Sequence, residues 1–408
     1  MSSHSPAARR THHRVVVIGG GTAGIAVAAR LRRGGIDGGD LALIEPSDTH
    51  YYQPLWTLVG GGLAPVEASA RPMGRLIPAG VDWIRDAAAS IDPRERVVHL
   101  ASGAQASYDR LVVAPGIQLN WDELSGMGEA VHSPRASSNY SPTLAPKTWE
   151  LIRGMREGTA VFTMPANPIK CAGAPQKIAY LAADHWRREG VLDRIRIVMV
   201  LPTPGMFGVP VFARELERVV ERYGIEVRFN SEAVEFHPDA QEVIVADNAA
   251  GTKEALAYDL LHTVPRQSAP DWLRATELAV PDSPTGYVDV DKHTLRHVRF
   301  PEVFALGDAG STPNSKTGAA IRKQAPVVAA HVLDSLAGRD LGAHYDGYAS
   351  CPLTTARDRL LLAEFDYTLE PHPTLPVIDT LRERRDRGVF KRRLLPAMYW
   401  NAMMRGRA

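Results

Sequence analysis

Apolar runs and helical patterns alternate near the start of the chain and predict a βαβ unit. Residues 14–18 (RVVVI) form a β-branched run that is typical of a buried parallel strand. Apolar side chains then recur at helical spacing through residues 25–31, and residues 41–44 (LALI) form the next buried run. The pattern therefore predicts a strand, a helix and a second strand in close succession.

Later parts of the chain carry runs of the same kind. We expect buried strands at residues 108–113, 195–201 and 303–306. Residues 315–321 (SKTGAAI) then start a helix, because their Ser and Thr side chains suit an N-cap.

The turn after the first predicted strand has the spacing of a dinucleotide-binding motif. Gly19, Gly21 and Gly24 fit G-x-G-x-x-G, in which glycines allow a tight turn, a close approach to pyrophosphate and helix–strand packing. Glu45 ends the second predicted strand, 21 residues after Gly24, where a carboxylate accepts hydrogen bonds from an adenosine ribose and repels a 2′-phosphate. The motif predicts dinucleotide binding and disfavours NADP. The alternative is a glycine-rich turn beside an incidental surface Glu45.

Composition narrows the function classes. A chain of 408 residues is expected to form two or three domains. The net charge of +1 gives no field that would attract nucleic acid. No apolar run is long enough to span a membrane, and the polar residues 1–13 lack the apolar core of a secretory signal, so we expect a cytosolic chain.

Two cysteines, Cys171 and Cys351, are the candidates for redox chemistry. In the cytosol, paired thiols more often do redox or metal work than form a standing structural disulfide. Neither a CxxC nor an HExxH motif occurs, and we interpret His293 and His297 as a solvated face, so no metal site is expected.

Three motifs in order resemble the disulfide-reductase-like flavoproteins, which have two dinucleotide-binding domains. They are the glycine turn, residues 108–116 (YDRLVVAPG) and residues 303–308 (VFALGD). The resemblance implies an α/β fold and FAD as cofactor, with Asp308 near its ribityl-phosphate part and a helix N-terminus facing the flavin. It assigns these further residues to the cofactor: Ala23, Gln53, Ala88, Lys316, Thr317, Gly318 and Ala319. The alternative role for Asp308 is that of a helix or turn cap.

The same resemblance divides the chain into domains. A discontinuous FAD domain is expected at residues 13–140 and 285–375, and a second Rossmann-like domain at residues 145–284. In NAD(P)H-dependent relatives a second glycine turn binds the nicotinamide cofactor. We expect its equivalent at residues 202–208, where Pro202 and Pro204 remove amide donors, so NADH is not the expected electron donor.

The segments around the cysteines carry a closer resemblance. They are residues 162–177 around Cys171 and 345–353 around Cys351, supported by residues 137–140, 288–291, 362–367 and 399–401. These segments resemble sulfide:quinone oxidoreductases of the two-cysteine, mitochondrial type. The resemblance implies oxidation of hydrogen sulfide to persulfide sulfur, with reduction of ubiquinone or menaquinone. The sulfur acceptor is left open among glutathione, sulfite and cyanide.

The resemblance also implies the roles of the two cysteines. Oxidised Cys171 and Cys351 are linked directly or through an extra sulfur; sulfide attacks at Cys351, and the Cys171 thiolate passes electrons to the flavin. If both cysteines serve catalysis, none is left to tether FAD, which favours non-covalent binding. The alternative is a pair of buried structural thiols.

The last part of the chain is basic and amphipathic. Residues 381–408 contain nine Lys/Arg and two Asp/Glu, and residues 394–404 (LLPAMYWNAMM) form an apolar body with Tyr and Trp. We expect residues 380–408 to form a membrane- and quinone-associating segment, lying in the interface on the cytoplasmic face of the membrane as in a peripheral protein. The alternative is a helix docked on its own core or on a second copy of the chain in a homodimer.

Three other functions remain open at this stage. A type II NADH:quinone oxidoreductase would need an intact second glycine turn. A flavocytochrome sulfide dehydrogenase subunit would need export and a cytochrome partner. A non-catalytic flavin and thiol redox sensor would need no turnover.

Overall fold

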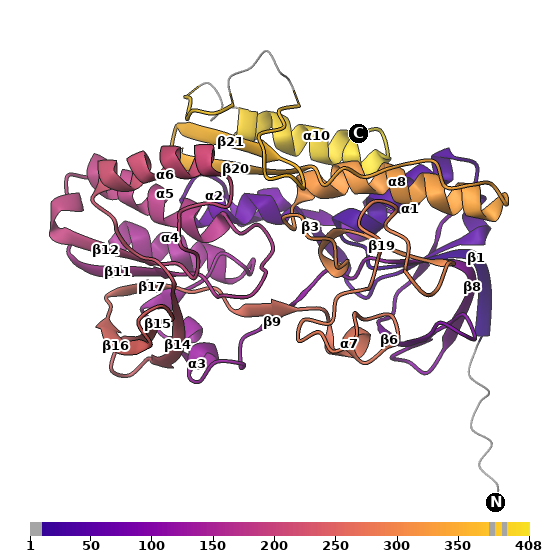
Figure 1. The fold of residues 1–408 in the computed structure, drawn as a ribbon, viewed down its shortest axis with the longest axis horizontal. Coiled ribbons are helices and arrows are strands. Elements are labelled where there is room, and N and C mark those ends of the chain that lie inside the picture. Colours follow the sequence, from indigo (N-terminus) through magenta and orange to yellow (C-terminus); the bar gives the residue numbers. More distant parts are fainter. Residues whose placement is uncertain (1–9, 375–379, 386–389) are drawn as a thin grey trace, which may run out of the picture.

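The computed structural model describes residues 10–374, 380–385 and 390–408. Figure 1 shows an elongated molecule with one sheet in each half and a layer of C-terminal elements along one side.

The first half contains the predicted βαβ unit. Strand β1 (Arg10–Ile18) pairs in parallel with β2 (Leu41–Ile44) and β8 (Gln105–Val113), and α1 (Thr22–Arg33) connects β1 to β2. The sheet has the order β5-β2-β1-β8-β7-β6, and β19 (Val303–Ala305) pairs with β8. The remaining strands are β5 (Asp82–Ile84), β6 (Ala88–Asp92) and β7 (Val97–Leu100). Helix α8 (Gly318–Leu336) packs beside α1, which completes a Rossmann-like sheet.

The second half has a parallel sheet with the order β10-β17-β11-β12-β13. Helices α5 (Ala174–Arg188) and α6 (Pro210–Tyr223) connect β11 to β12 and β12 to β13. The strands are β10 (Ala136–Ser137), β11 (Gly158–Thr163), β12 (Ile195–Val200), β13 (Glu226–Arg228) and β17 (Leu260–His262). An antiparallel sheet of β14 (Ser231–His237), β15 (Glu242–Asp247) and β16 (Thr252–Ala257) extends this half.

Smaller elements join and cover the halves. Strands β9 (Gln118–Asn120) and β18 (Arg266–Ser268) pair with each other where the chain passes from one half of the molecule to the other (Figure 1). The others are β3 (Thr49–Tyr51), β4 (Ala70–Pro72), α2 (Trp56–Gly60), α3 (Met127–His132), α4 (Leu144–Gly154) and α7 (Asp271–Arg274). The predicted mixed α/β fold with a Rossmann-like sheet is confirmed, while the domain limits stay predictions.

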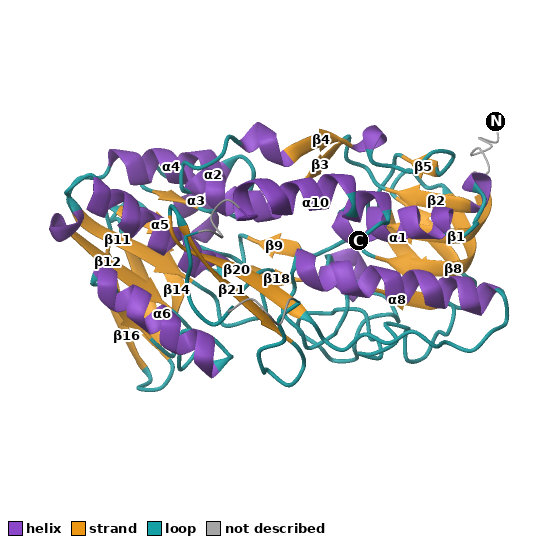
Figure 2. Cartoon of the chain, turned by 90° about the horizontal axis from the view of Figure 1, so that it is seen from above, coloured by secondary structure: helices purple, strands orange, loops and turns teal. Residues whose placement is uncertain are grey.

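A hairpin and a terminal helix cover both halves. Strands β20 (Ala349–Ala356) and β21 (Arg359–Phe365) form the hairpin, and α10 (Leu395–Asn401) lies beside it. In Figure 2, which views the molecule from above, α10 lies across the middle and runs toward α1. Tyr399, Met403 and Met404 are buried in the same apolar cluster as α1. The apolar body therefore docks on its own core, which was the alternative to a helix lying in lipid.

One further expectation changes in the structure. His297 is 3% exposed, and its Nε2 lies 3.1 Å from the carbonyl oxygen of Leu278, so the predicted solvated face is wrong for this residue. Within residues 10–374, 380–385 and 390–408, we find no helix with the length and apolar character needed to cross a membrane.

Candidate active site

The two cysteines, 180 positions apart in the chain, meet at the junction of the halves. The Sγ atoms of Cys171 and Cys351 lie 3.9 Å apart, and both residues are free thiols. This is a contact between two unbonded sulfurs, since a disulfide bond is about 2.05 Å long. Cys351 is buried and Cys171 is partly buried, so Cys171 is the more accessible of the two sulfurs.

Cys171 lies in the loop between β11 and the N-terminus of α5. Its φ of 50° is left-handed and strained for a side-chain-bearing residue. Its N–H donates to the carbonyl oxygen of Lys316 at 2.8 Å, and its carbonyl oxygen accepts from the N–H of Ala174 at 2.7 Å. The loop thus holds the thiol near the positive end of a 15-residue helix, which favours a thiolate.

Cys351 comes from β20 of the hairpin and faces the same loop. A Cβ atom added to Gly173 would lie 2.7 Å from the Cys351 Sγ. Only glycine therefore leaves room for this close approach of loop and strand.

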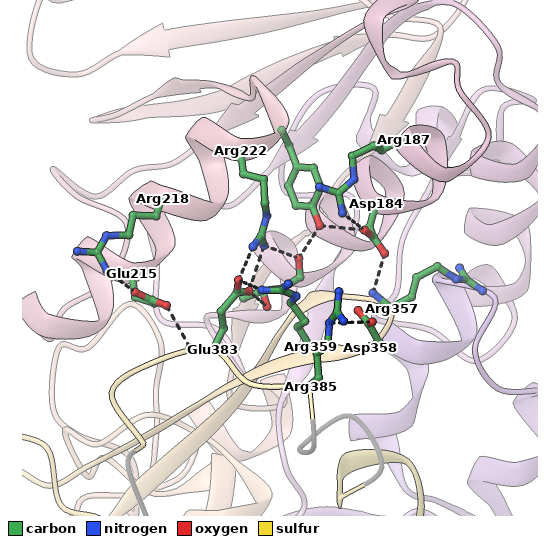
Figure 3. Close-up of polar contacts among 12 residues, drawn as sticks. Asp184, Arg187, Glu215, Arg218, Arg222, Arg357, Asp358, Arg359, Glu383 and Arg385 are labelled. Atoms are coloured by element: carbon green, nitrogen blue, oxygen red, sulfur yellow. Dashed lines mark hydrogen bonds and ion pairs between the residues drawn. The ribbon is translucent and has the colours of Figure 1, made fainter.

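Polar contacts at the far end of the hairpin anchor it to α5 and α6 (Figure 3). The Asp184 carboxylate accepts from the backbone N–H of Arg357 at 3.0 Å, and the Tyr223 hydroxyl donates to the carbonyl oxygen of Thr355 at 3.0 Å. The Glu383 carboxylate accepts from the Thr355 hydroxyl at 2.6 Å and pairs with Arg222. These contacts set where β20 places Cys351.

A lysine of α5 lies between the two sulfurs. The Lys177 Nζ is 3.0 Å from the Cys171 Sγ and 3.9 Å from the Cys351 Sγ, and the residue is 4% exposed. Burial alone lowers the pKa of Lys177, but the two sulfurs outweigh burial and raise its pKa above the usual value. The ammonium therefore stays charged. Sequence reasoning gave Lys177 no role, although it falls within the segment that carried the resemblance.

A second lysine reaches the pair from the C-terminal segment. Lys391, counted above with the membrane-facing basic residues, is instead buried, and its Nζ donates to the Pro352 carbonyl oxygen at 3.0 Å. Burial and repulsion from Lys177 lower the pKa of Lys391 to about 7. The contact of Lys391 with Pro352, the residue after Cys351, could not be predicted from the sequence, because it joins segments that are far apart in the chain.

The two cysteines differ in acidity. A hydrogen bond from Cys351 holds the pKa of Cys171 well below its usual range, helped by Lys177 and Lys391 against the effect of burial. The same hydrogen bond, together with burial and the Cys171 charge, raises the pKa of Cys351. Cys171 is therefore the thiolate and Cys351 the thiol of the reduced pair.

The glycine turn and Glu45 lie together in the structure. Gly19, Gly21 and Gly24 lie at the junction of β1 and α1, and the Glu45 carboxylate accepts from the Gly20 N–H at 2.7 Å. Helix α1 has Gly21 at its N-cap, with no side-chain cap and no acidic residue in its first turn. Its amides are thus available to an anion.

The late Gly-Asp motif also lies near the cysteines. Asp308 follows β19, and the Lys316 Nζ donates to the carbonyl oxygens of Asp308 at 2.9 Å and Gly310 at 2.8 Å. Burial raises the pKa of Asp308, opposed by Lys316 and Lys170. The Thr317 hydroxyl caps α8 by accepting from the Ala320 N–H at 3.2 Å, which confirms the expected N-cap.

The remaining predicted cofactor residues lie in several places. Gly318 and Ala319 begin α8, Ala23 is in the first turn of α1, and Ala88 begins β6. The Gln53 side chain accepts from the Lys170 Nζ at 2.7 Å, beside the Cys171 loop. Their contacts with a cofactor stay predictions.

In the second half, the turn equivalent to the glycine turn does not lie at residues 202–208, where we expected it. In the first sheet β1 lies between β8 and β2, and in the second β11 lies in the same way between β17 and β12. The position equivalent to the glycine turn is therefore the loop after β11, which carries Cys171, and not residues 202–208. Those residues follow β12, where the Met206 carbonyl oxygen accepts from Gln176 at 2.6 Å.

Comparison with known proteins agrees with this geometry. Residues 13–147 match the family model for pyridine nucleotide-disulphide oxidoreductases. The mouse (Mus musculus) mitochondrial sulfide:quinone oxidoreductase is 39% identical over 97% of this chain and 87% of the relative. That of Dictyostelium discoideum is 37% identical over 97% of this chain and 86% of the relative.

The chain belongs to the sulfide:quinone oxidoreductase family. The crystal structure of this enzyme from Aquifex aeolicus has the same fold, with a TM-score of 0.79 at 20% identity over 98% of this chain and 92% of the other. The predicted membership is confirmed, and the chain is an oxidoreductase.

FAD is the cofactor of this family, and the residues present fit it. A Cβ atom at Gly21 would meet nothing within 4 Å, so the uncapped start of α1 is open for a pyrophosphate. Glu45 is fixed at the end of β2, where a ribose is expected, and the capped N-terminus of α8 lies beside Asp308.

The charge of Lys177 is testable through the Cys171 thiol. Lys177→Met keeps the side-chain stem and removes the charge, so the pKa of Cys171 rises and the thiolate fraction falls about tenfold for each pKa unit. In the reduced protein the pH profile of Cys171 alkylation, followed by mass spectrometry, should shift to higher pH.

Lys147→Met is the matched control, because Lys147 binds the carbonyl oxygens of Val131 and Ser133 away from the sulfurs. A Cys171 profile identical in wild type and Lys177→Met would show that the ammonium does not set the acidity of the thiol.

Proposed function

We propose that this chain oxidises hydrogen sulfide to sulfane sulfur and transfers the electrons through FAD to a membrane quinone. The contact of Cys171 with Cys351 beside Lys177 carries this proposal. Two sulfurs next to a buried ammonium form the minimum needed to bind a sulfide-derived atom and to stabilise the charge that its attack releases.

The acidity difference supports the expected division of labour. Starting from the oxidised disulfide, HS⁻ attacks the Cys351 sulfur, which forms a Cys351 persulfide and releases the Cys171 thiolate. The thiol with the lower pKa leaves faster, and Lys177 holds the charge that appears on it. A nucleophilic acceptor then takes the outer sulfur, and closure of the two thiolates to a disulfide yields two electrons. FAD held at the glycine turn would supply the acceptor for these two electrons and the route to quinone.

NADH as the donor is disfavoured by the loop after β11. Pro165, Pro168 and the strained Cys171 occupy the position where a nicotinamide-binding turn would need glycines. This supports sulfide oxidation over a type II NADH:quinone oxidoreductase.

Cys171→Ser and Cys351→Ser should each abolish bleaching of the flavin absorbance by sulfide while FAD stays bound. Anaerobic titration with sulfide, followed by a quinone, measures this; NADH added in place of sulfide should bleach none of the proteins. Normal bleaching by sulfide in both variants would refute the mechanism. Quinone-coupled turnover in the wild type would exclude a redox sensor.

Membrane attachment is proposed to involve the exposed start of the C-terminal segment. Arg393 and Leu394 are exposed, and Leu394 is 57% exposed, whereas Tyr399, Met403 and Met404 are buried. We place these exposed residues against the cytoplasmic face of the membrane that holds the quinone.

Arg393→Glu should weaken binding to vesicles of anionic phospholipid by about 1 kcal/mol or more, roughly fivefold. Arg214→Glu makes the same charge change on the exposed face of α6 and serves as the control. Equal vesicle binding of the two variants in a sedimentation assay would argue against this contact surface.

The sulfur acceptor is proposed to bind in a cavity of about 870 Å³ beside β9 and β18. Its wall includes Asn167 and Gln267, and the Gln267 side chain accepts from the backbone N–H of Lys170 at 2.9 Å, next to Cys171. Arg266 and Arg274 line it together with acidic residues. Mixed charge and this size suit a zwitterionic amide such as glutathione better than sulfite or cyanide.

Ala166→Trp narrows this cavity from an exposed position and should raise the KM for glutathione several-fold, while leaving the KM for cyanide and flavin bleaching by sulfide unchanged. Ala249→Trp adds the same bulk to a distant exposed loop. Unchanged glutathione kinetics in steady-state assays of Ala166→Trp would place the acceptor elsewhere.

A further inference from the structure

A buried chain of hydrogen bonds links the C-terminal segment to the glycine turn. The Tyr399 hydroxyl lies 2.8 Å from the Thr22 Oγ1 and 2.6 Å from the His50 Nε2, and the His50 Nδ1 lies 2.9 Å from the Gly20 carbonyl oxygen. Tyr399 and His50 are 3% and 2% exposed, so solvent does not compete for these contacts. Thr22 and Gly20 flank Gly21, the N-cap of α1.

The direction of each bond follows from the groups. A carbonyl oxygen only accepts, so the His50 Nδ1–H donates to Gly20. Burial lowers the pKa of His50 against the effect of this bond, so the ring is neutral and its Nε2 accepts from the Tyr399 hydroxyl. The Thr22 hydroxyl then donates to the Tyr399 oxygen. The Tyr399 hydroxyl, through His50, thus joins the Thr22 side of the turn to the Gly20 side.

Packing holds Tyr399 in this place. Its ring centroid is 4.3 Å from that of Tyr52 and 4.8 Å from that of Trp400, and the Arg71 guanidinium lies over the Trp400 ring at 5.0 Å. Met403 and Met404 join the apolar cluster that contains α1. The rings and the methionines hold the C-terminal segment on the core. The Tyr399 hydroxyl connects this segment to the glycine turn through its hydrogen bonds.

We propose that Tyr399 is a cofactor-positioning residue, through which docking of residues 395–404 and binding of FAD at the α1 turn are thermodynamically linked. The bond at the Gly20 carbonyl oxygen holds the peptide plane between Gly20 and Gly21, and the bond at the Thr22 hydroxyl holds the Thr22 side chain at the start of α1. Together they fix the turn whose amides face a pyrophosphate. Because linkage is reciprocal, FAD also holds the C-terminal segment on the core. The proposal rests on FAD as cofactor but on no step of sulfide chemistry.

Tyr399→Phe removes the hydroxyl and keeps the ring packing, and it leaves the Thr22 hydroxyl and the His50 Nε2 without their partner. The rate of FAD release, measured by the rise in flavin fluorescence on dilution, should increase about fivefold or more. Thr22→Val is isosteric and removes one bond, so it should show a smaller increase. Tyr108→Phe is the control. Tyr108 is buried in β8, which pairs with β1 in the sheet that leads into the glycine turn, and its hydroxyl has no hydrogen-bond partner among the described residues.

Limited trypsinolysis after Arg393 gives the reciprocal measurement. FAD should slow this cleavage in the wild type, and the protection should shrink in Tyr399→Phe but not in Tyr108→Phe. FAD release at the wild-type rate from Tyr399→Phe, or cleavage after Arg393 that does not respond to FAD in the wild type, would overturn the proposal. Both readouts are independent of sulfide, so failure of the proposed function would leave them unchanged.

Discussion

The site depends on a buried ammonium held against two sulfur atoms. Lys177 is nearly inaccessible to solvent, and burying a cation is unfavourable unless an opposite charge accompanies it. The Cys171 sulfur at 3.0 Å supplies that charge as a thiolate. The N-terminus of α5 beside Cys171 also stabilises the thiolate. The electrostatics therefore favour a state in which one cysteine is ionised and the other is not. This asymmetry distinguishes two otherwise equivalent sulfurs.

Holding that contact requires two segments that are far apart in the chain. One sulfur comes from the loop after β11 and the other from the hairpin, which packs in the same apolar cluster as α5 and α6. The Asp184 and Glu383 contacts fix the hairpin on α5 and α6, while the bond from Cys171 to the Lys316 carbonyl oxygen ties the loop to the start of α8. The placement of the hairpin and of the Cys171 loop thus sets the sulfur–sulfur distance.

The C-terminal segment has a structural role that could not be predicted from its composition. Helix α1 is buried around almost its whole circumference, and such a helix needs apolar cover on the side away from its sheet. Tyr399, Met403 and Met404 provide that cover. A basic, aromatic-rich sequence is typical of a membrane-surface helix, but here Tyr399, Met403 and Met404 are buried inside the protein.

Local patterns determined much of this molecule. The βαβ unit, the glycine turn, the Glu45 position and the Thr317 cap depend on neighbours in sequence, so they could be predicted, and the segments around Cys171 and Cys351 indicated the family. Only the tertiary structure decided the rest. The place of Lys391 beside Cys351, the identity of the turn after β11 and the docking of Tyr399 join residues far apart in the chain. Such contacts depend on how packed elements fit together, and no local periodicity encodes them.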